Sequence, residues 1–263
     1  MFAPLKKSIK NKNVYIINHQ FLHFIPFEVL YDGRQFLVNQ YSFSYIPSAS
    51  ILQFLDSSQK KYDSILIFGN PKIDYIDNYI SLKYAEEEAI MIAKIFSSKN
   101  IYLKNSATET IFREQSKYHD ICHIASHGLF DATNPLNSML LLSKDNKNDG
   151  IITAKELYEI QINSPLIILS SCETAKAEIG NGDELIGLIR GFFFAGTSSV
   201  LASLWKVDDI ATKELMVLFY KYLKYGKKTI IQALQQAKID MINSKDYNHP
   251  FFWGPFVLYG IGY

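Results

Sequence analysis

The chain has 263 residues, of which 48% are hydrophobic and 20% charged, and its formal net charge at pH 7 is +1. This length and hydrophobic content are enough for one large α/β domain with a substantial core. The near-zero net charge argues against nucleic acid or anionic lipid as a direct partner, and the apolar runs are far shorter than the roughly 20 residues of a membrane span. Two cysteines argue against a disulfide framework, and the first residues lack the apolar segment of a secretory signal, so we expect a cytoplasmic protein.

The N-terminal part of the chain, residues 1–60, favours a β-hairpin. Residues 14–30 and 35–50 are rich in β-branched and aromatic residues, and they flank the turn sequence YDGR. The polar segment 55–64 then leads into a different pattern. We therefore expect a hairpin region over 1–60 and an α/β core over 61–263, within a single domain.

Short apolar strands alternate with amphipathic helices from residue 61 onward. Strands are predicted over 64–71, 100–104, 120–128, 165–171, 198–205 and 251–260, and helices over 81–99, 108–117, 183–196, 208–226 and 227–244. Thr108 is predicted to cap the second of these helices. Such alternation is typical of βα units on a largely parallel sheet that helices cover on both faces.

Two of the predicted strands end in side chains that could do chemistry together. His127 lies at the carboxyl end of strand 120–128, and Cys172 follows strand 165–171, 45 residues further on. Sites in parallel sheets gather at the carboxyl ends of strands, and an adjacent imidazole lowers the pKa of a thiol and favours the reactive thiolate. If the strands are neighbours, the pair is suited to nucleophilic catalysis. The alternative is structural: a small buried cysteine, and a polar residue that ends a strand.

Gly128 directly follows His127. Because glycine has no side chain, its backbone N–H can approach a substrate carbonyl closely. Together with the backbone N–H of Cys172, it could form an oxyanion hole.

Further potential metal ligands lie close to His127. His119, Cys122 and His123 suggest a metal site by their residue types. Strand alternation, however, sends Cys122 to the face opposite His123. Cys122 also lies about 16 Å back along the strand from His127, at roughly 3.3 Å per residue, which is too far to pair with Cys172. We therefore expect neither a metal nor another cofactor.

Several blocks of the sequence resemble, in order, the signature blocks of the CHAT domain. This is a caspase-like, separase-related clan CD cysteine peptidase family that often follows TPR repeats. The blocks begin with HIASHG, DGIITAKEL and HPFFWGP, and the second contains LSSCETA. They cover residues 123–143, 149–223 and 249–260, with further similarity at 21–50, 66–75 and 82–96.

The resemblance implies a fold and a site. The fold is a caspase-like three-layer sandwich with a mostly parallel central sheet, here with an N-terminal β-hairpin extension. The catalytic dyad maps onto His127 and Cys172, and the family's glycine after the histidine maps onto Gly128.

A group of residues near the predicted strand ends could line a substrate pocket. The group consists of Asp183, Glu184, Trp205, Asp208 and Asp209. In caspase-like folds the loop after the strand predicted here at 198–205 shapes this pocket, which favours Asp208 and Asp209. Both residues would serve equally as helix caps. Asp183 and Glu184 are alternative acidic residues that could bind a basic substrate side chain. Trp205 is either a pocket wall or a core residue. Ser170 stands where several Arg/Lys-specific relatives have Asp, which argues against a basic side chain.

The resulting hypothesis is a cysteine endopeptidase that acts on a specific protein or peptide substrate. The resemblance implies bacterial defence or cell-death signalling, and regulation by an upstream domain or by a partner such as a TPR-containing protein. The main alternative is a catalytically latent domain that binds peptides or serves as a scaffold. A weaker one is another acyl-transfer reaction at the same residues, such as amidase or transpeptidase chemistry.

Overall fold

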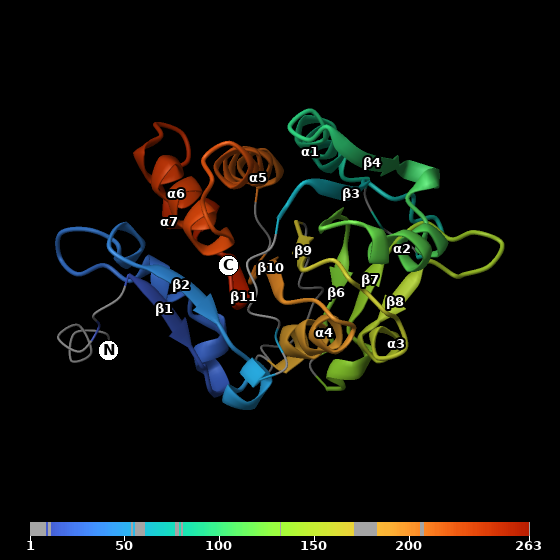
Figure 1. The fold of residues 1–263 in the computed structure, drawn as a ribbon, viewed down its shortest axis with the longest axis horizontal. Helices are drawn as coiled ribbons and strands as arrows, with labels where there is room; N and C mark the ends of the chain where they lie inside the picture. Colours follow the sequence, from blue (N-terminus) through green and yellow to red (C-terminus); the bar gives the residue numbers. More distant parts are fainter. Residues whose placement is uncertain are drawn as a thin grey trace.

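The computed structural model describes residues 9, 12–53, 55, 61–76, 79, 81–131, 133–170, 183–205 and 208–262. Their strands form a central eight-stranded sheet in the order β1-β2-β11-β10-β9-β5-β3-β4, in which all neighbours except β10 and β11 run parallel (Figure 1). The strands are β1 (Asn13–Ile16), β2 (Ser42–Tyr45), β3 (Ser64–Gly69), β4 (Ser98–Leu103), β5 (Ile121–Ala125), β9 (Leu166–Leu169), β10 (Ser199–Ser203) and β11 (Phe256–Gly260).

Helices cover both faces of this sheet, and Figure 1 shows α1 and α5 on one side of the central strands and α4 on the other. The first face carries α1 (Lys83–Ala93), α5 (Asp209–Lys224), α6 (Ile230–Asn243) and α7 (Pro250–Trp253). The second face carries α2 (Glu109–Gln115), α3 (Ala154–Leu157), α4 (Asp183–Phe194) and a small antiparallel sheet of β6 (Gly128–Leu129), β7 (Met139–Leu141) and β8 (Ile151–Thr153).

Short 3-10 helices occupy several connections. They are η1 (Gln20–Phe24), η2 (Phe27–Val29), η3 (Leu37–Asn39), η4 (Ala49–Gln53), η5 (Lys104–Ser106), η6 (Ser116–Tyr118) and η7 (Pro135–Asn137). Within the described residues, no helix is both long enough and apolar enough to cross a membrane.

The central strands are buried on both faces, as expected for parallel strands that helices cover on each side. In β3, Leu66 and Phe68 pack into the core on the α4 side, whereas Ile65 and Ile67 pack into the core under α1 and α5. The predicted α/β class and the mostly parallel central sheet are confirmed. Thr108 also caps α2 as predicted, since its side chain accepts a hydrogen bond from the backbone N–H of Ile111.

The predicted N-terminal hairpin is wrong. β1 and β2 run parallel, with Asn13 opposite Ser42, and β2 joins the central sheet through Tyr45 opposite Tyr259 of β11. The turn YDGR carries a single antiparallel bridge, Tyr31 to Phe36. Three 3-10 helices lie between the two strands and return the chain in its original direction. Apolar residues in such turns mimic the composition of a strand, so periodicity could not separate the two.

The predicted strand over 251–260 is also shorter than expected. Its first part is the helix α7, because Pro250 occupies the first turn and the His249 side chain accepts a hydrogen bond from the backbone N–H of Phe251. β11 begins only at Phe256 and runs antiparallel to β10.

Candidate active site

The strands that precede His127 and Cys172 are neighbours, as the sequence analysis required. β5 and β9 pair in parallel with Ile121 opposite Leu166, and the backbone N–H of Ser170 donates to the carbonyl of Ile124 at 3.0 Å. The two strands therefore end at the same level of the sheet. Cys172 lies outside the described residues, so its pairing with His127 stays a prediction.

His127 is held where β5 gives way to the small second sheet. Its carbonyl accepts a hydrogen bond from the backbone N–H of Leu141 at 3.0 Å, and Gly128 begins β6 opposite Leu140 of β7. The imidazole is 4% exposed, and the Tyr79 ring meets it edge to face, with 4.8 Å between centroids and 85° between planes. These contacts fix the ring at the carboxyl edge of the sheet. The oxyanion role of Gly128 stays a prediction.

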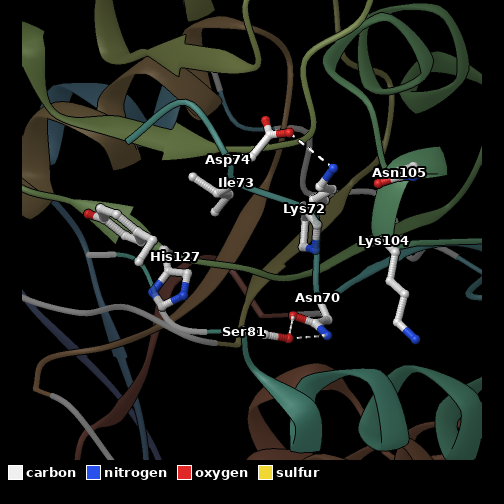
Figure 2. Close-up of a pocket in the computed structure, with 10 residues that line it drawn as sticks. Asn70, Lys72, Ile73, Asp74, Ser81, Lys104, Asn105 and His127 are labelled. Carbon is white, nitrogen blue, oxygen red and sulfur yellow. Dashed lines mark hydrogen bonds and ion pairs between the residues drawn. The ribbon is translucent and has the colours of Figure 1, made fainter. Parts of the chain in front are cut away.

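A cavity of about 320 Å³ adjoins His127 on the side of β3 and β4 (Figure 2). Its walls come from the chain after β3, from the segment before α1 and from η5. They consist of Asn70, Pro71, Lys72, Ile73, Asp74, Tyr79, Ser81, Lys104, Asn105 and His127. In Figure 2 the imidazole faces the Asn70 and Lys72 wall.

Two residues of this wall have a strained backbone. Asn70 and Lys104 directly follow β3 and β4, and both have φ of 49°. Non-glycine residues in this region cost on the order of 1–3 kcal/mol unless local contacts compensate them, and asparagine less than most. The Asn70 carboxamide provides such contacts, since Oδ1 accepts from the backbone N–H of Leu82 at 2.8 Å and Nδ2 donates to Ser81 Oγ at 3.0 Å. Strain of this kind clusters at binding and catalytic sites.

The charges at this cavity are balanced. Lys72 Nζ lies 3.0 Å from Asp74, and Lys104 Nζ lies 3.1 Å from Glu86. The hydrogen bond from the Lys72 ammonium, together with the charge of Lys144, lowers the pKa of the Asp74 carboxyl. The cavity therefore presents paired charges rather than a field of one sign.

Three of the residues predicted to line a substrate pocket, Trp205, Asp208 and Asp209, lie away from this cavity. Asp208 caps α5, because its Oδ1 accepts from the backbone N–H groups of Ile210 and Ala211 at 3.1 and 3.0 Å. Asp209 is the first residue of α5, and the Trp205 indole N–H donates to the Phe251 carbonyl at 3.4 Å. None of these three belongs to the described wall of the cavity beside His127.

Two other predicted pocket residues, Asp183 and Glu184, open α4, and their side chains lie outside the description. The substrate role of all five predicted pocket residues stays a prediction.

Sequence reasoning missed the cavity residues after β3, although a signal was present. The stretch GNP at 69–71 ends a predicted parallel strand, and the rule that drew attention to His127 applies equally there. Tyr79 and Ser81 gave no such signal, because only the folded chain brings them beside His127.

The other potential metal ligands near His127 lie apart from one another. Cys122 is fully buried in the core on the α4 side, and that burial raises the pKa of its thiol far above the ordinary range. His123 faces α5 on the opposite side, where its ring contacts Tyr220. His119 Nδ1 lies 3.0 Å from the Gln115 carbonyl. Among the described residues, no three His, Cys, Asp or Glu side chains are grouped to bind a metal.

The architecture is a caspase-like α/β fold. The chain aligns with the Arg-specific cysteine proteinase gingipain R (RgpB) of Porphyromonas gingivalis at a TM-score of 0.63 and 9% identity, covering 99% of this chain and 66% of that one. It aligns with separase in the separase–securin complex of Saccharomyces cerevisiae at a TM-score of 0.61 and 18% identity, covering 91% of this chain and 15% of that one. At such low identity these likenesses show the fold alone.

The chain belongs to the CHAT domain family, whose family model matches residues 1–261. It is also similar to human tetratricopeptide repeat protein 28, with 25% identity over 287 residues that cover 91% of this chain and 11% of that protein. The mouse protein of the same name is 24% identical, with 12% of its length covered. The chain thus spans about a tenth of the length of these relatives.

Proposed function

We propose that this CHAT domain is a cysteine endopeptidase in which Cys172 is the nucleophile and His127 the general acid–base. One observation carries the proposal. His127 is buried at the carboxyl end of β5, at the edge of a cavity, and the adjacent parallel strand β9 leads within three residues of sequence to Cys172. In parallel α/β sheets this edge is where catalytic groups from neighbouring strands converge.

The proposed reaction needs these residues and water. The Cys172 thiolate attacks the scissile carbonyl carbon, and the carbonyl electron pair moves onto the oxygen, which the backbone N–H groups of Gly128 and Cys172 bind. The tetrahedral intermediate collapses as His127 gives its proton to the departing amine, which leaves a thioester. His127 then takes a proton from water, whose oxygen attacks the thioester and releases the carboxylate product and the thiol.

The cavity beside His127 supports a role in substrate binding. Its volume of about 320 Å³ leaves room for a substrate side chain, and Pro71, Ile73 and Tyr79 give it apolar walls. Because its lysines already contact carboxylates, we expect that side chain to be aliphatic or uncharged polar rather than acidic. This expectation is independent of the acidic residues predicted around α5.

Regulation by a protein partner is part of the proposal. The curated relatives carry tetratricopeptide repeats in their name, and the CHAT resemblance points to a TPR-containing or other regulatory partner. We place the activity in bacterial defence or cell-death signalling on the basis of the family resemblance, and in the cytoplasm because two cysteines argue for a reducing compartment.

Cleavage of a proteome-derived peptide library tests the proposed activity. Mass spectrometry of new N-termini should find cleavage products with the wild-type chain and none with Cys172→Ala or His127→Ala. Products that persist with Cys172→Ala would contradict the assignment of the nucleophile. A wild-type chain that binds peptides without cleaving any would instead favour the latent binding domain.

A further inference from the structure

A cluster of four buried polar side chains lies between the proposed catalytic strands and the helices that cover them. We call it the Glu88 cluster, and its members come from four separate elements. They are Glu88 of α1, His123 of β5, Ser170 after β9 and Tyr220 of α5, with exposures of 1%, 0%, 2% and 0%. A carboxylate so deep in an α/β core is costly unless polar groups compensate it.

The contacts of the cluster converge on one carboxylate oxygen. Ser170 Oγ donates to Glu88 Oε1, and His123 Nε2 lies 2.9 Å from the same oxygen, at an angle that does not make an aligned hydrogen bond. On the far side of the ring, Tyr220 OH lies 3.0 Å from His123 Nδ1. Burial and the nearby Glu88 charge raise the pKa of the Tyr220 phenol, which therefore keeps its proton.

The cluster touches both strands close to the proposed catalytic residues. His123 precedes His127 by four residues, and Ser170 precedes Cys172 by two. The Ser170 backbone is already tied to β5 through the Ile124 carbonyl. The bond from its hydroxyl to Glu88 adds a second constraint, which ties the end of β9 to α1.

We propose that Glu88 is a positioning residue: through Ser170 and His123 it holds the carboxyl ends of β9 and β5 in the relative placement that brings Cys172 and His127 together. The inference rests on the proposed function. A hydrophobic residue of similar size would fill the space under α1, but it would leave the two strand ends without a shared anchor. The cluster acts through other residues and touches no reacting atom.

A matched control exists in the same chain. Glu28 of η2 is 2% exposed, and its Oε2 accepts a hydrogen bond from the Tyr45 hydroxyl at 2.5 Å, as Glu88 Oε1 accepts one from the Ser170 hydroxyl. Its other partner is Lys238 of α6, at 3.2 Å. Neither strand end at the proposed active site contributes to this second cluster. Glu28→Gln therefore removes a buried carboxylate of the same kind without touching the ends of β5 and β9.

The test measures the alkylation of Cys172 by iodoacetamide against pH, by peptide mass spectrometry of the full chain. Wild type, Glu88→Gln, Ser170→Ala, Glu28→Gln and His127→Ala are compared well below their unfolding temperatures. We expect Glu88→Gln and Ser170→Ala to move the pH profile upward and to slow alkylation at pH 7 about tenfold or more, as misplaced catalytic groups do. Glu28→Gln should lose thermal stability and keep the wild-type profile.

Each other outcome overturns the inference in a distinguishable way. If Glu88→Gln and Ser170→Ala only lower the unfolding temperature, the Glu88 cluster is structural. If Glu28→Gln moves the profile equally, the effect is general destabilisation and positioning is refuted. If His127→Ala leaves the wild-type profile unchanged, the proposed dyad itself fails, and the inference fails with it. Ser170→Ala removes a single hydroxyl, so it keeps the test decisive should Glu88→Gln not fold.

Discussion

The buried ion pair between Lys238 of α6 and Glu28 of η2 predicts a large and specific loss of stability. Lys238 is 1% and Glu28 2% exposed, and Nζ lies 3.2 Å from Oε1. At an effective dielectric constant of about 20, two unit charges at that distance attract by about 5 kcal/mol, which offsets much of the cost of burying both. Lys238→Met keeps most of the side-chain volume but leaves the Glu28 carboxylate without its lysine partner, with the hydrogen bond from the Tyr45 hydroxyl still in place.

We expect Lys238→Met to lower the free energy of unfolding by about 3–5 kcal/mol, the usual cost of leaving one buried charge uncompensated. For a domain of this size that corresponds to a fall of about 6–15 °C in the unfolding temperature. The double variant Glu28→Gln/Lys238→Met should recover at least half of the loss, because no unpaired charge remains. Urea unfolding followed by circular dichroism measures both. A single variant that loses less than about 1 kcal/mol, or a double variant whose loss equals the sum of the single ones, would refute the reasoning.

The same lysine gives a prediction for pH. Burial lowers the pKa of Lys238 from its ordinary 10.5, although the Glu28 charge opposes the shift. At pH values between the lowered pKa of Lys238 in the folded chain and 10.5, the unfolded chain binds more protons than the folded chain. The contribution of Lys238 to stability therefore rises with pH in that window. The stability of wild type should therefore rise relative to Lys238→Met as the pH increases toward 10.5, and a relative fall would contradict the shift.

Three further predictions test the surroundings of the site. Hydrogen bonds from the Thr133 hydroxyl and the Asn134 backbone lower the pKa of Asp131 from 3.8 to about 2, so its contribution to stability is present above pH 3.8 and lost as the pH falls through about 2. The stability difference between wild type and Asp131→Asn, followed by acid unfolding, should shrink over that window, and a constant difference would contradict this. In Gly69→Ala the new Cβ would meet Ala89 Cβ of α1 at 2.6 Å. This overpacking should lower the free energy of unfolding in urea by about 1–3 kcal/mol. An unchanged unfolding midpoint would show that α1 moves freely. Cys122 should resist iodoacetamide in the native chain and react in urea, because burial keeps its thiol protonated; rapid native labelling would contradict its placement.

Local periodicity predicted the elements of the core because these are buried in regular patterns. The runs at 64–69 and 121–125 are mostly apolar, which is typical of parallel strands covered on both faces, and both are strands of the central sheet. The adjacency of β5 and β9 followed from the rule that sites gather at strand ends, together with the CHAT resemblance. The placement of His127 at the end of β5, next to β9, was therefore predictable from the sequence, whereas its catalytic role stays a prediction.

The features that escaped prediction depend on contacts between distant residues. The parallel pairing of β1 and β2 depends on three intervening 3-10 helices and on the edge of β11, which no local window contains. The cavity wall depends on Tyr79 and Ser81 meeting the ends of β3 and β5 in space. The Glu88 cluster joins residues 82 positions apart through one hydrogen bond, and no spacing rule would have paired Glu88 with Ser170.

The most direct test of the proposed dyad is the pH dependence of Cys172 alkylation in wild type and in His127→Ala, with Cys122 as the internal reference. A thiolate stabilised by an adjacent imidazole should be labelled rapidly below pH 7, and this labelling should collapse in His127→Ala while Cys122 stays unreactive. Slow labelling of Cys172 that is the same in both chains would contradict the proposal that His127 and Cys172 act together.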